Sequence, residues 1–248
     1  MLNIKRNENM YSTDAIKRAI TNPEYTLKAM LAYPSLKPDI QYITKQLNNN
    51  FTQEERARYA HGASAGLKEC VLYALVRHYK PGLMIETGVA QGVSTYFILK
   101  AMHENRKGKL ISIDEPNYNP KGYIDNGGNR DNVYIPKGRQ AGWLVPEEYR
   151  YRWKLITGRS NVWLQSIKDI PDMFFHDSDH SYENMKYELE WAIANIRSGG
   201  IIIADDTSRN AAWTETSNRY GLRQISSPIS AAKFIRPTPS RAEEEDLA

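Results

Sequence analysis

The chain has 248 residues, of which 41% are hydrophobic and 25% are charged, a composition that is ordinary for a globular enzyme. The formal charge of +4 is mild and the basic residues form no cluster along the chain, so we expect no nucleic-acid partner. The N-terminus lacks the apolar core of a secretory signal, and no apolar run is long enough to cross a bilayer. Cys70 is the only cysteine, which excludes an internal disulfide and fits a reducing, cytoplasmic setting.

The sequence contains no internal repeat and no Gly/Ser linker that would divide it into several domains. Residues 1–50 are polar with scattered helical pieces, such as Tyr25 to Leu31. Residues 1–65 are interpreted as an N-terminal helical cap or lid, with a frayed arm as the alternative. Residues 66–240 form the main domain, and the polar tail 241–248 is predicted to be disordered.

Within the main domain, helical patterns alternate with short apolar runs. The predicted elements are, in chain order, a helix over 67–79, strands over 83–85 and 110–113 with a helix over 93–103 between them, strands over 153–156 and 173–175, a helix over 182–196, a strand over 201–203, and an edge strand over 231–235. This alternation predicts an α/β fold of the Rossmann-like type, with a mostly parallel seven-stranded sheet covered by helices on both faces.

Residues 115–152 interrupt the pattern, are rich in Asn, Gly, Pro and Tyr, and are predicted to be a long insertion loop. Two interpretations of its aromatic residues Trp143, Tyr149 and Trp153 stay open. They could shape the pocket for a substrate, or they could anchor the loop to the core, which we slightly favour.

A glycine-containing turn follows the first predicted strand, in the run Glu86-Thr87-Gly88-Val89-Ala90-Gln91-Gly92. Ligands of open α/β sheets bind outside the carboxyl ends of the strands, where glycines let the backbone turn sharply and approach a ligand. The spacing is not Gly-x-Gly-x-x-Gly, and an acid precedes the turn, which would repel a pyrophosphate but suits an ammonium group. The alternative is a tight strand–helix connection without a ligand.

Asp114 ends the second predicted strand, a little over twenty residues beyond the turn. An acid at this position is placed to accept hydrogen bonds from the hydroxyls of a ribose. A single Asp after a strand could also cap the next segment. Together with the glycine turn, it indicates a nucleoside cofactor without a diphosphate.

Further acids follow two later strands, Asp177 after residues 173–175 and Asp205 and Asp206 after residues 201–203. Carboxylates that converge from neighbouring parallel strands favour a hard divalent cation such as Mg²⁺, which would lower the pKa of a substrate hydroxyl. His180, three residues past Asp177, is the natural general base for a hydroxyl.

Structural roles compete with each of these assignments. Asp179 or Ser181 could cap the helix that begins near Tyr182, and the Asp205–Asp206 pair could cap a helix after Thr207. His176 is more easily explained as a structural residue at the end of its strand than as a ligand.

These motifs resemble those of class I S-adenosylmethionine-dependent methyltransferases over roughly residues 66–210. Met84–Thr95 looks like their first motif and Ile111–Asp114 like their second. Phe175–Glu183, Arg197–Gly200 and Ile203–Asp206 are similar to the branch that contains macrocin and mycinamicin sugar O-methyltransferases and cephalosporin-hydroxylase-like proteins.

The resemblance implies a role for each matching residue. The cofactor S-adenosylmethionine would be bound by Glu86, Gly88, Ala90, Gly92, Ser94, Thr95, Asp114, Gly158, Ser160 and Asp177. Mg²⁺ would be bound by Asp177, Asp205 and Asp206, and the catalytic residues would be His180 and Asp177.

The expected reaction is methyl transfer to a hydroxyl of a small molecule, a sugar or a natural-product scaffold, with the assistance of a metal. One alternative is a metal-independent N-methyltransferase that acts on a peptide or an amine, and another is a cofactor-binding protein without turnover. The sequence leaves the acceptor, the regiochemistry and the formation of a homo-oligomer open.

Overall fold

The computed structural model describes residues 23–51, 65–116, 135–136, 138–226 and 229–235. The predicted disordered tail, 241–248, lies outside the described residues, as do residues 1–22 and 52–64 of the predicted cap. The elements are α2 (Pro23–Asn50), α4 (Leu67–Tyr79), β1 (Leu83–Thr87), α5 (Val93–Glu104), β2 (Lys109–Asp114), α7 (Glu147–Arg150), β3 (Trp153–Thr157), α8 (Ser160–Trp163), η2 (Leu164–Ser166), β4 (Met173–His176), α9 (Tyr182–Asn195), β5 (Ile201–Ala204), α10 (Ala212–Tyr220), β6 (Arg223–Ser226) and β7 (Ser230–Lys233).

The strands form one seven-stranded sheet in the order β3-β2-β1-β4-β5-β7-β6. The strands from β1 to β5 pair in parallel, whereas β7 pairs antiparallel with both β5 and β6. The predicted mostly parallel α/β sheet is thereby confirmed.

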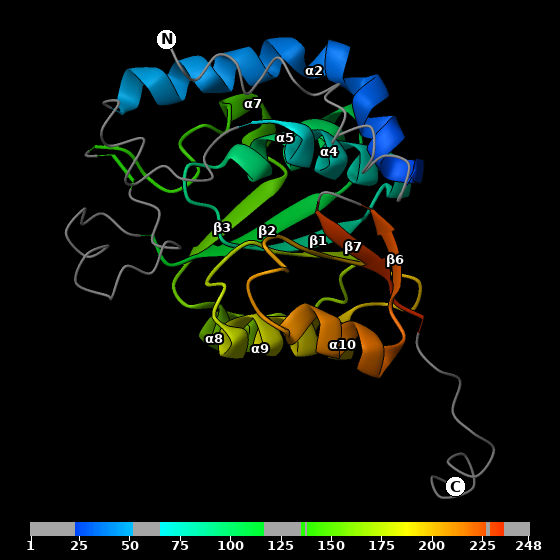
Figure 1. The fold of residues 1–248 in the computed structure, drawn as a ribbon. Helices are drawn as coiled ribbons and strands as arrows, with labels where there is room; N and C mark the ends of the chain where they lie inside the picture. Colours follow the sequence, from blue (N-terminus) through cyan, green and yellow to red (C-terminus); the bar gives the residue numbers. More distant parts are fainter. Residues whose placement is uncertain (1–22, 52–64, 117–134, 137, 227–228, 236–248) are drawn as a thin grey trace, which may run out of the picture.

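Helices cover both faces of the sheet (Figure 1), with α2, α4, α5 and α7 above it and α8, α9 and α10 below it. Successive residues of a strand point to opposite faces, so Met84 of β1 packs into the upper core and Ile85 into the lower core. Both faces of the central strands are buried, which explains their continuous apolar sequence.

Parallel pairing places the carboxyl ends of the central strands at one edge of the sheet. Thr87 of β1 is paired with His176 of β4, which is in turn paired with Ala204 of β5, and Asp114 of β2 is paired with Thr157 of β3. The segments that follow these strands therefore lie next to each other, at the edge where open α/β sheets bind their ligands.

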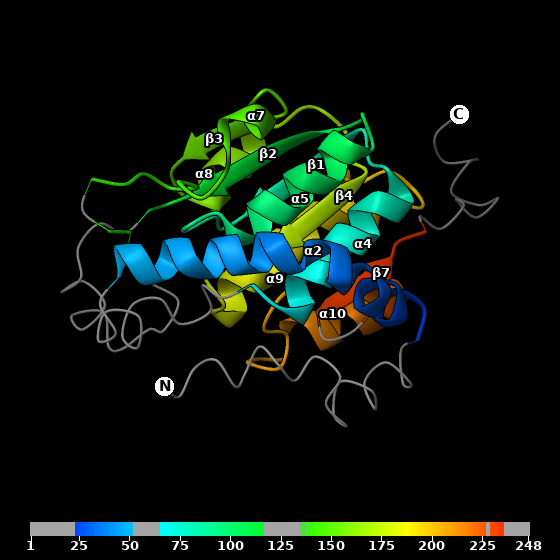
Figure 2. The same cartoon turned by 90° about the horizontal axis from the view of Figure 1, so that it is seen from above.

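Within the predicted cap, residues 23–50 form one 28-residue helix rather than the scattered pieces that we predicted. Pro34 and Pro38 lie inside α2, and each removes an N–H donor from the helix, which curves in Figure 1. The helix persists because Leu36, Ile40, Ile43 and Leu47 recur on one face and are buried in the upper core. Figure 2 shows α2 crossing above α4 and α5.

The C-terminal part of the sheet differs from the prediction in one respect. The predicted edge strand corresponds to β7, which lies between β5 and β6, and β6 is the strand at the edge. The sequence of β6, Arg-Gln-Ile-Ser, has a single large apolar residue, so its apolar signal was too weak to mark a strand.

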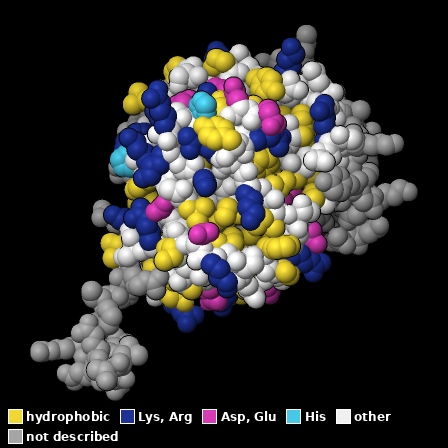
Figure 3. Space-filling model, turned by 180° about the vertical axis from the view of Figure 1, so that it is seen from behind, with side chains coloured by type: hydrophobic (Ala, Val, Ile, Leu, Met, Phe, Trp, Pro, Cys, Tyr) yellow, Lys and Arg dark blue, Asp and Glu magenta, His cyan; other side chains and the backbone are white. Residues whose placement is uncertain are grey.

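On the face in Figure 3, lysine and arginine side chains are scattered among acidic, neutral and apolar ones. None of the described helices is both long and apolar enough to span a bilayer.

Candidate functional site

The turn after β1 lies at the centre of the strand ends. Gly88 has φ of +82°, and its N–H donates to the carbonyl oxygen of Ile113 at 2.9 Å. A Cβ at Gly88 would overlap the backbone carbonyl of Asp177, so glycine is required here by conformation and by close packing. The turn after β1 is thereby held directly against the segment after β4.

Gly92, the N-cap of α5, also has a positive φ, of +88°. A Cβ there would lie 2.7 Å from the Cα of Gly142. The predicted reason for this glycine, close approach of a ligand, is therefore incomplete, because the insertion segment packs directly on this position.

Asp114 is buried at the end of β2, with 8% of its surface exposed. Its Oδ1 accepts hydrogen bonds from the backbone N–H groups of Val89, at 2.8 Å, and Ala90, at 3.3 Å. Its Oδ2 is buried and has no hydrogen-bond partner among the described residues. Burial raises the pKa of Asp114, and the two backbone N–H groups oppose this shift. Two backbone N–H groups thus hold Oδ1 in place, whereas no hydrogen-bond donor among the described residues reaches Oδ2.

Glu86 is completely buried on the α5 side of β1. Its carboxylate accepts hydrogen bonds from three hydroxyls, those of Ser94 at 2.8 Å, Thr95 at 2.9 Å and Ser112 at 2.6 Å. Burial raises the pKa of Glu86 to about 7, although these hydrogen bonds act in the opposite direction. Glu86, Ser94 and Thr95, predicted to bind the cofactor, contact one another beneath the turn, and their contact with a ligand stays a prediction.

Gly158 and Ser160 follow β3, and Gly158 lies beside Asp114. The N–H of Gly158 donates to the carbonyl oxygen of Asp114 at 2.7 Å, and Ser160 begins α8. The structure therefore brings these two predicted cofactor residues to the same edge as the glycine turn.

The end of the insertion, residues 138–152, is anchored to the glycine turn and to β2. The N–H groups of Gly142 and Leu144 donate to the carbonyls of Ala90 and Gln91, at 2.9 and 3.1 Å. The indole N–H of Trp143 donates to the Gln91 side chain at 2.5 Å, and that of Trp153 to Ser112 at 2.9 Å. Tyr149 is buried in the upper core. These contacts support the anchoring interpretation of Trp143, Tyr149 and Trp153, whereas residues 117–134 and 137 of the insertion lie outside the described part of the chain.

A lysine lies between two of the predicted metal ligands. The Lys68 Nζ is 2.6 Å from Asp205 Oδ2 and 3.2 Å from Asp177 Oδ2, and the three side chains are 23%, 19% and 20% exposed. Burial raises the pKa of Asp177 to about 7 against the opposing charge of Lys68, with the charge of Asp205 adding to the rise. Burial also acts to raise the pKa of Asp205, but the charge and hydrogen bond of Lys68 hold it below its ordinary value.

The three predicted metal ligands do not converge. Asp206, with φ of +48°, is exposed and forms an ion pair with Arg209 at 2.7 Å. Among the described residues, no group of three or more His, Cys, Asp or Glu side chains is placed to hold a metal ion. The residues therefore do not fit the predicted magnesium site, because one acid points elsewhere and the Lys68 ammonium lies between the other two.

His180 lies beside Asp177, as predicted. Its Nε2 is 3.8 Å from Asp177 Oδ1, within ion-pair distance, and its side chain is 7% exposed. The backbone carbonyl of His180 accepts a hydrogen bond from the side chain of Asn210 at 2.9 Å. Ser181 is the N-cap of α9, so the capping role considered for this residue is confirmed.

A buried polar network underlies His180. Glu188 of α9 accepts hydrogen bonds from Thr87 at 2.5 Å and Ser178 at 2.7 Å, and its carboxylate lies 2.6 Å from the His176 Nδ1. The ring of His176 meets that of His180 edge-on, with centroids 5.1 Å apart. His176 is thus a buried structural residue at the end of its strand that supports the segment carrying Asp177 and His180.

Sequence reasoning missed Lys68 and Glu188, although each leaves a signal. Lys68 stands in the first turn of α4, where the helix dipole disfavours a cation. Glu188 stands on the apolar face of α9 beside Met185 and Leu189, where an acid needs a buried partner.

The fold is the α/β Rossmann-like fold of methyltransferases. Residues 85–207 match the family model described as "Methyltransferase domain". The chain thus carries a methyltransferase domain, and it is a methyltransferase. No curated protein matches it.

Solved structures share the fold at low sequence identity. The cofactor-bound Rv0187 from MTB has a TM-score of 0.52 and 14% identity over 86% of this chain and 97% of its own. The methyltransferase PaMTH1 of Podospora anserina, solved with bound SAH, has a TM-score of 0.49 and 15% identity over 74% of this chain and 86% of its own. A putative O-methyltransferase from Klebsiella pneumoniae has a TM-score of 0.49 and 16% identity over 80% and 97%. At 14% identity the likeness to Rv0187 concerns the fold alone.

Proposed function

We propose that this chain transfers a methyl group from S-adenosylmethionine to a hydroxyl group of a small molecule, a sugar or a natural-product scaffold. The observation that carries the proposal is the carboxylate of Asp114. Its Oδ1 is held by two backbone N–H groups, whereas its Oδ2 is buried with no hydrogen-bond partner among the described residues. Such an oxygen is costly to bury unless a ligand donates to it.

A ribose supplies the donors that Asp114 needs. An acid at the end of the second strand of a Rossmann-like sheet is placed to accept hydrogen bonds from ribose hydroxyls. Gly158, whose N–H is bonded to the Asp114 carbonyl, adjoins the same position and would lie beside the adenine. The residues present therefore fit the adenosyl half of the cofactor.

The reaction itself needs little from the protein beyond alignment and removal of a proton. The cofactor, when bound, supplies a methyl carbon on a sulfonium: the acceptor oxygen forms a bond to this carbon as the carbon–sulfur bond breaks, with its electron pair left on sulfur. The proton of the hydroxyl goes to His180, and the Asp177 carboxylate, 3.8 Å from His180 Nε2, stabilises the imidazolium that forms.

The pairing of His180 with Asp177 favours a hydroxyl acceptor over an amine. A hydroxyl must lose its proton to become a good nucleophile, whereas a neutral amine attacks without a base. Methylation of an amine is the competing function, and a His180 variant with undiminished methyl transfer would favour it.

Calorimetric titration with S-adenosylmethionine tests the cofactor assignment. We expect Asp114→Ala to weaken binding at least tenfold, since a hydrogen bond to a charged group contributes about 1.5–3 kcal/mol. Asp169→Ala, which removes an exposed carboxylate, is the matched control and should bind like the wild type. Equal affinity of both variants would contradict the role of Asp114.

The acceptor class is tested by transfer of a radiolabelled methyl group to panels of hydroxylated and aminated small molecules. We expect label only on hydroxylated acceptors, with His180→Gln reducing the rate by about 10²-fold or more. Label on amines alone would contradict the hydroxyl assignment.

A further inference from the structure

Lys68 is the one cationic side chain that the described residues place between the carboxyl ends of β4 and β5. It comes from α4, whereas Asp177 and Asp205 follow the two neighbouring strands. Three separate elements thus bring one positive and two negative groups to the edge where the acceptor has to lie under the proposed function.

The position of Lys68 in its helix indicates that the two acids hold it there. It is the second residue of α4, where the positive end of the helix dipole disfavours an ammonium group. The carboxylate of Glu69 accepts a hydrogen bond from the N–H of Gly66 at 2.6 Å, which fixes the first turn of the helix and hence the origin of the Lys68 side chain.

The Lys68 ammonium offsets part of the negative charge of the two carboxylates. Burial acts to lower the pKa of Lys68, but the charges of Asp177, Asp205 and Glu69 raise it well above its ordinary value. Without the ammonium, Asp177 and Asp205 would face each other as two partly buried carboxylates, an arrangement that demands a cation or a shared proton.

We propose that the Lys68 ammonium takes the place of a divalent cation in this site, so that methyl transfer needs no metal. The tethered charge holds Asp177 and Asp205 at the edge of the sheet and thereby positions Asp177 next to His180. Lys68 is a positioning residue, since the contacts assigned to it are with the two carboxylates. The activity part of this inference rests on the proposed function, but its metal-binding part does not.

Removing the ammonium should open the pair of carboxylates to a divalent cation, because Mg²⁺ and Mn²⁺ bind through one or two carboxylates with water completing the shell. The probe is Mn²⁺, measured by the loss of the electron paramagnetic resonance signal of the free ion, with metal-free protein. We expect Lys68→Gln to bind Mn²⁺ at least tenfold more tightly than the wild type, and the double variant Lys68→Gln/Asp205→Asn to lose this gain. Lys68→Arg, which keeps the charge, should behave like the wild type.

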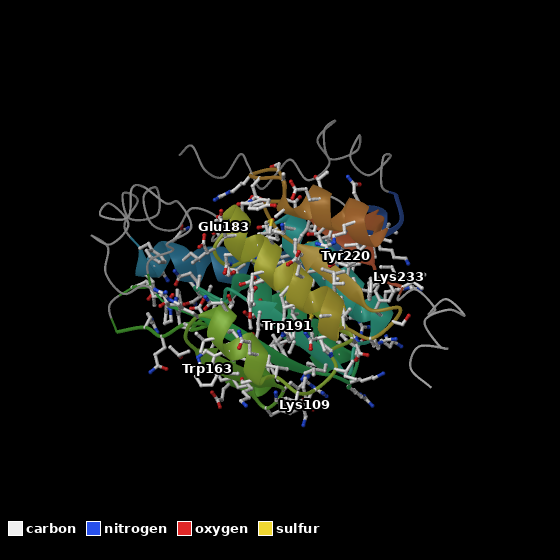
Figure 4. The ribbon with its side chains drawn as sticks, turned by 90° about the horizontal axis from the view of Figure 1, so that it is seen from below. Lys109, Trp163, Glu183, Trp191, Tyr220 and Lys233 are labelled. Carbon is white, nitrogen blue, oxygen red and sulfur yellow. The ribbon has the colours of Figure 1, made fainter. Side chains whose placement is uncertain are left out.

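The matched control is Lys109→Gln. Lys109 is exposed at the start of β2, at the amino end of the parallel strands, and Figure 4 shows it well away from Glu183, which lies in the first turn of α9, three residues after His180. This variant should leave Mn²⁺ binding and methyl transfer unchanged.

Two results would overturn the inference. The first is that Lys68→Gln binds Mn²⁺ no more tightly than Lys109→Gln does. The second is that the wild type binds Mn²⁺ and that the Asp205→Asn substitution abolishes this binding. The second measurement needs only the wild type and one variant, so it decides the question even if Lys68→Gln does not fold. Methyl transfer should persist in chelator for the wild type and become dependent on Mn²⁺ in Lys68→Gln. If neither the wild type nor any of the variants binds S-adenosylmethionine, the proposed function is refuted, and the Mn²⁺ result still decides the metal-binding part of the inference.

Discussion

Glu86 should make the stability of the protein fall as the pH rises. Its side chain is completely buried, and burial raises its pKa from 4.5 to about 7. The folded state therefore holds a proton between these two pH values that the unfolded chain has already released, so each pH unit in this window costs the folded state about 1.4 kcal/mol. Above pH 7 the full cost is about 3 kcal/mol, and below pH 4.5 it vanishes.

The substitution Glu86→Gln removes this titration and keeps an uncharged group of the same size among Ser94, Thr95 and Ser112. We expect the difference in unfolding free energy between the variant and the wild type to move in favour of the variant by about 2–3 kcal/mol between pH 5 and pH 8.5. Urea unfolding followed by circular dichroism over a series of pH values measures it. Asp169→Asn, at an exposed carboxylate, is the control and should show no such trend.

The comparison isolates Glu86, because Asp177, with a pKa also near 7, titrates in both proteins. Stability curves of wild type and Glu86→Gln that run parallel from pH 5 to pH 8.5 would refute the reasoning. They would mean that Glu86 stays ionised in the folded protein.

The remaining predictions concern Asp177 and Gly88. Because the pKa of Asp177 is raised to about 7 and its ionised form is the one that supports His180, kcat/KM should rise about tenfold per pH unit below 7 and level off above it. In Asp177→Asn the rate should be low and the pH profile should change, whereas an unchanged profile would remove Asp177 from the mechanism. Gly88→Ala should destabilise the protein by about 2 kcal/mol or more in chemical denaturation, because the new Cβ overlaps the Asp177 carbonyl and because alanine is strained at the positive φ of this residue. Gly138→Ala has nearly the same φ, of +81°, with open space around its Cβ, and an equal loss in both variants would show that the overlap costs nothing.

The regular part of the fold could be predicted from the sequence because local patterns determine it. The predicted helix over 67–79 matches α4, and the apolar runs that mark β1 to β5 fall within a residue or two of the observed strands. The N-terminal helix was not predicted because tertiary packing determines it. The sequence suggested only scattered helical pieces in this region, but the buried face of α2 against α4 and α5 keeps residues 23–50 one helix.

Site residues that directly follow a strand could be predicted, whereas a site residue that comes from a helix distant in the sequence was missed. Asp114, Asp177 and Asp205 follow their strands, so strand order alone brings them to one edge. Lys68 lies 109 and 137 residues away from its two partners. Its place in the first turn of a helix is unusual for a cation, but it does not identify these partners. The magnesium prediction counted the acids at the edge and omitted the cation that another helix supplies.

The central claim, that the edge around Asp114 binds an adenosyl cofactor, is tested most directly by a crystal structure with S-adenosylhomocysteine bound. The account predicts that a ribose hydroxyl donates to Asp114 Oδ2 at about 2.6–2.8 Å, with Val89 and Ala90 still bonded to Oδ1. A structure with the nucleoside bound elsewhere and Asp114 Oδ2 without a ribose contact would contradict it.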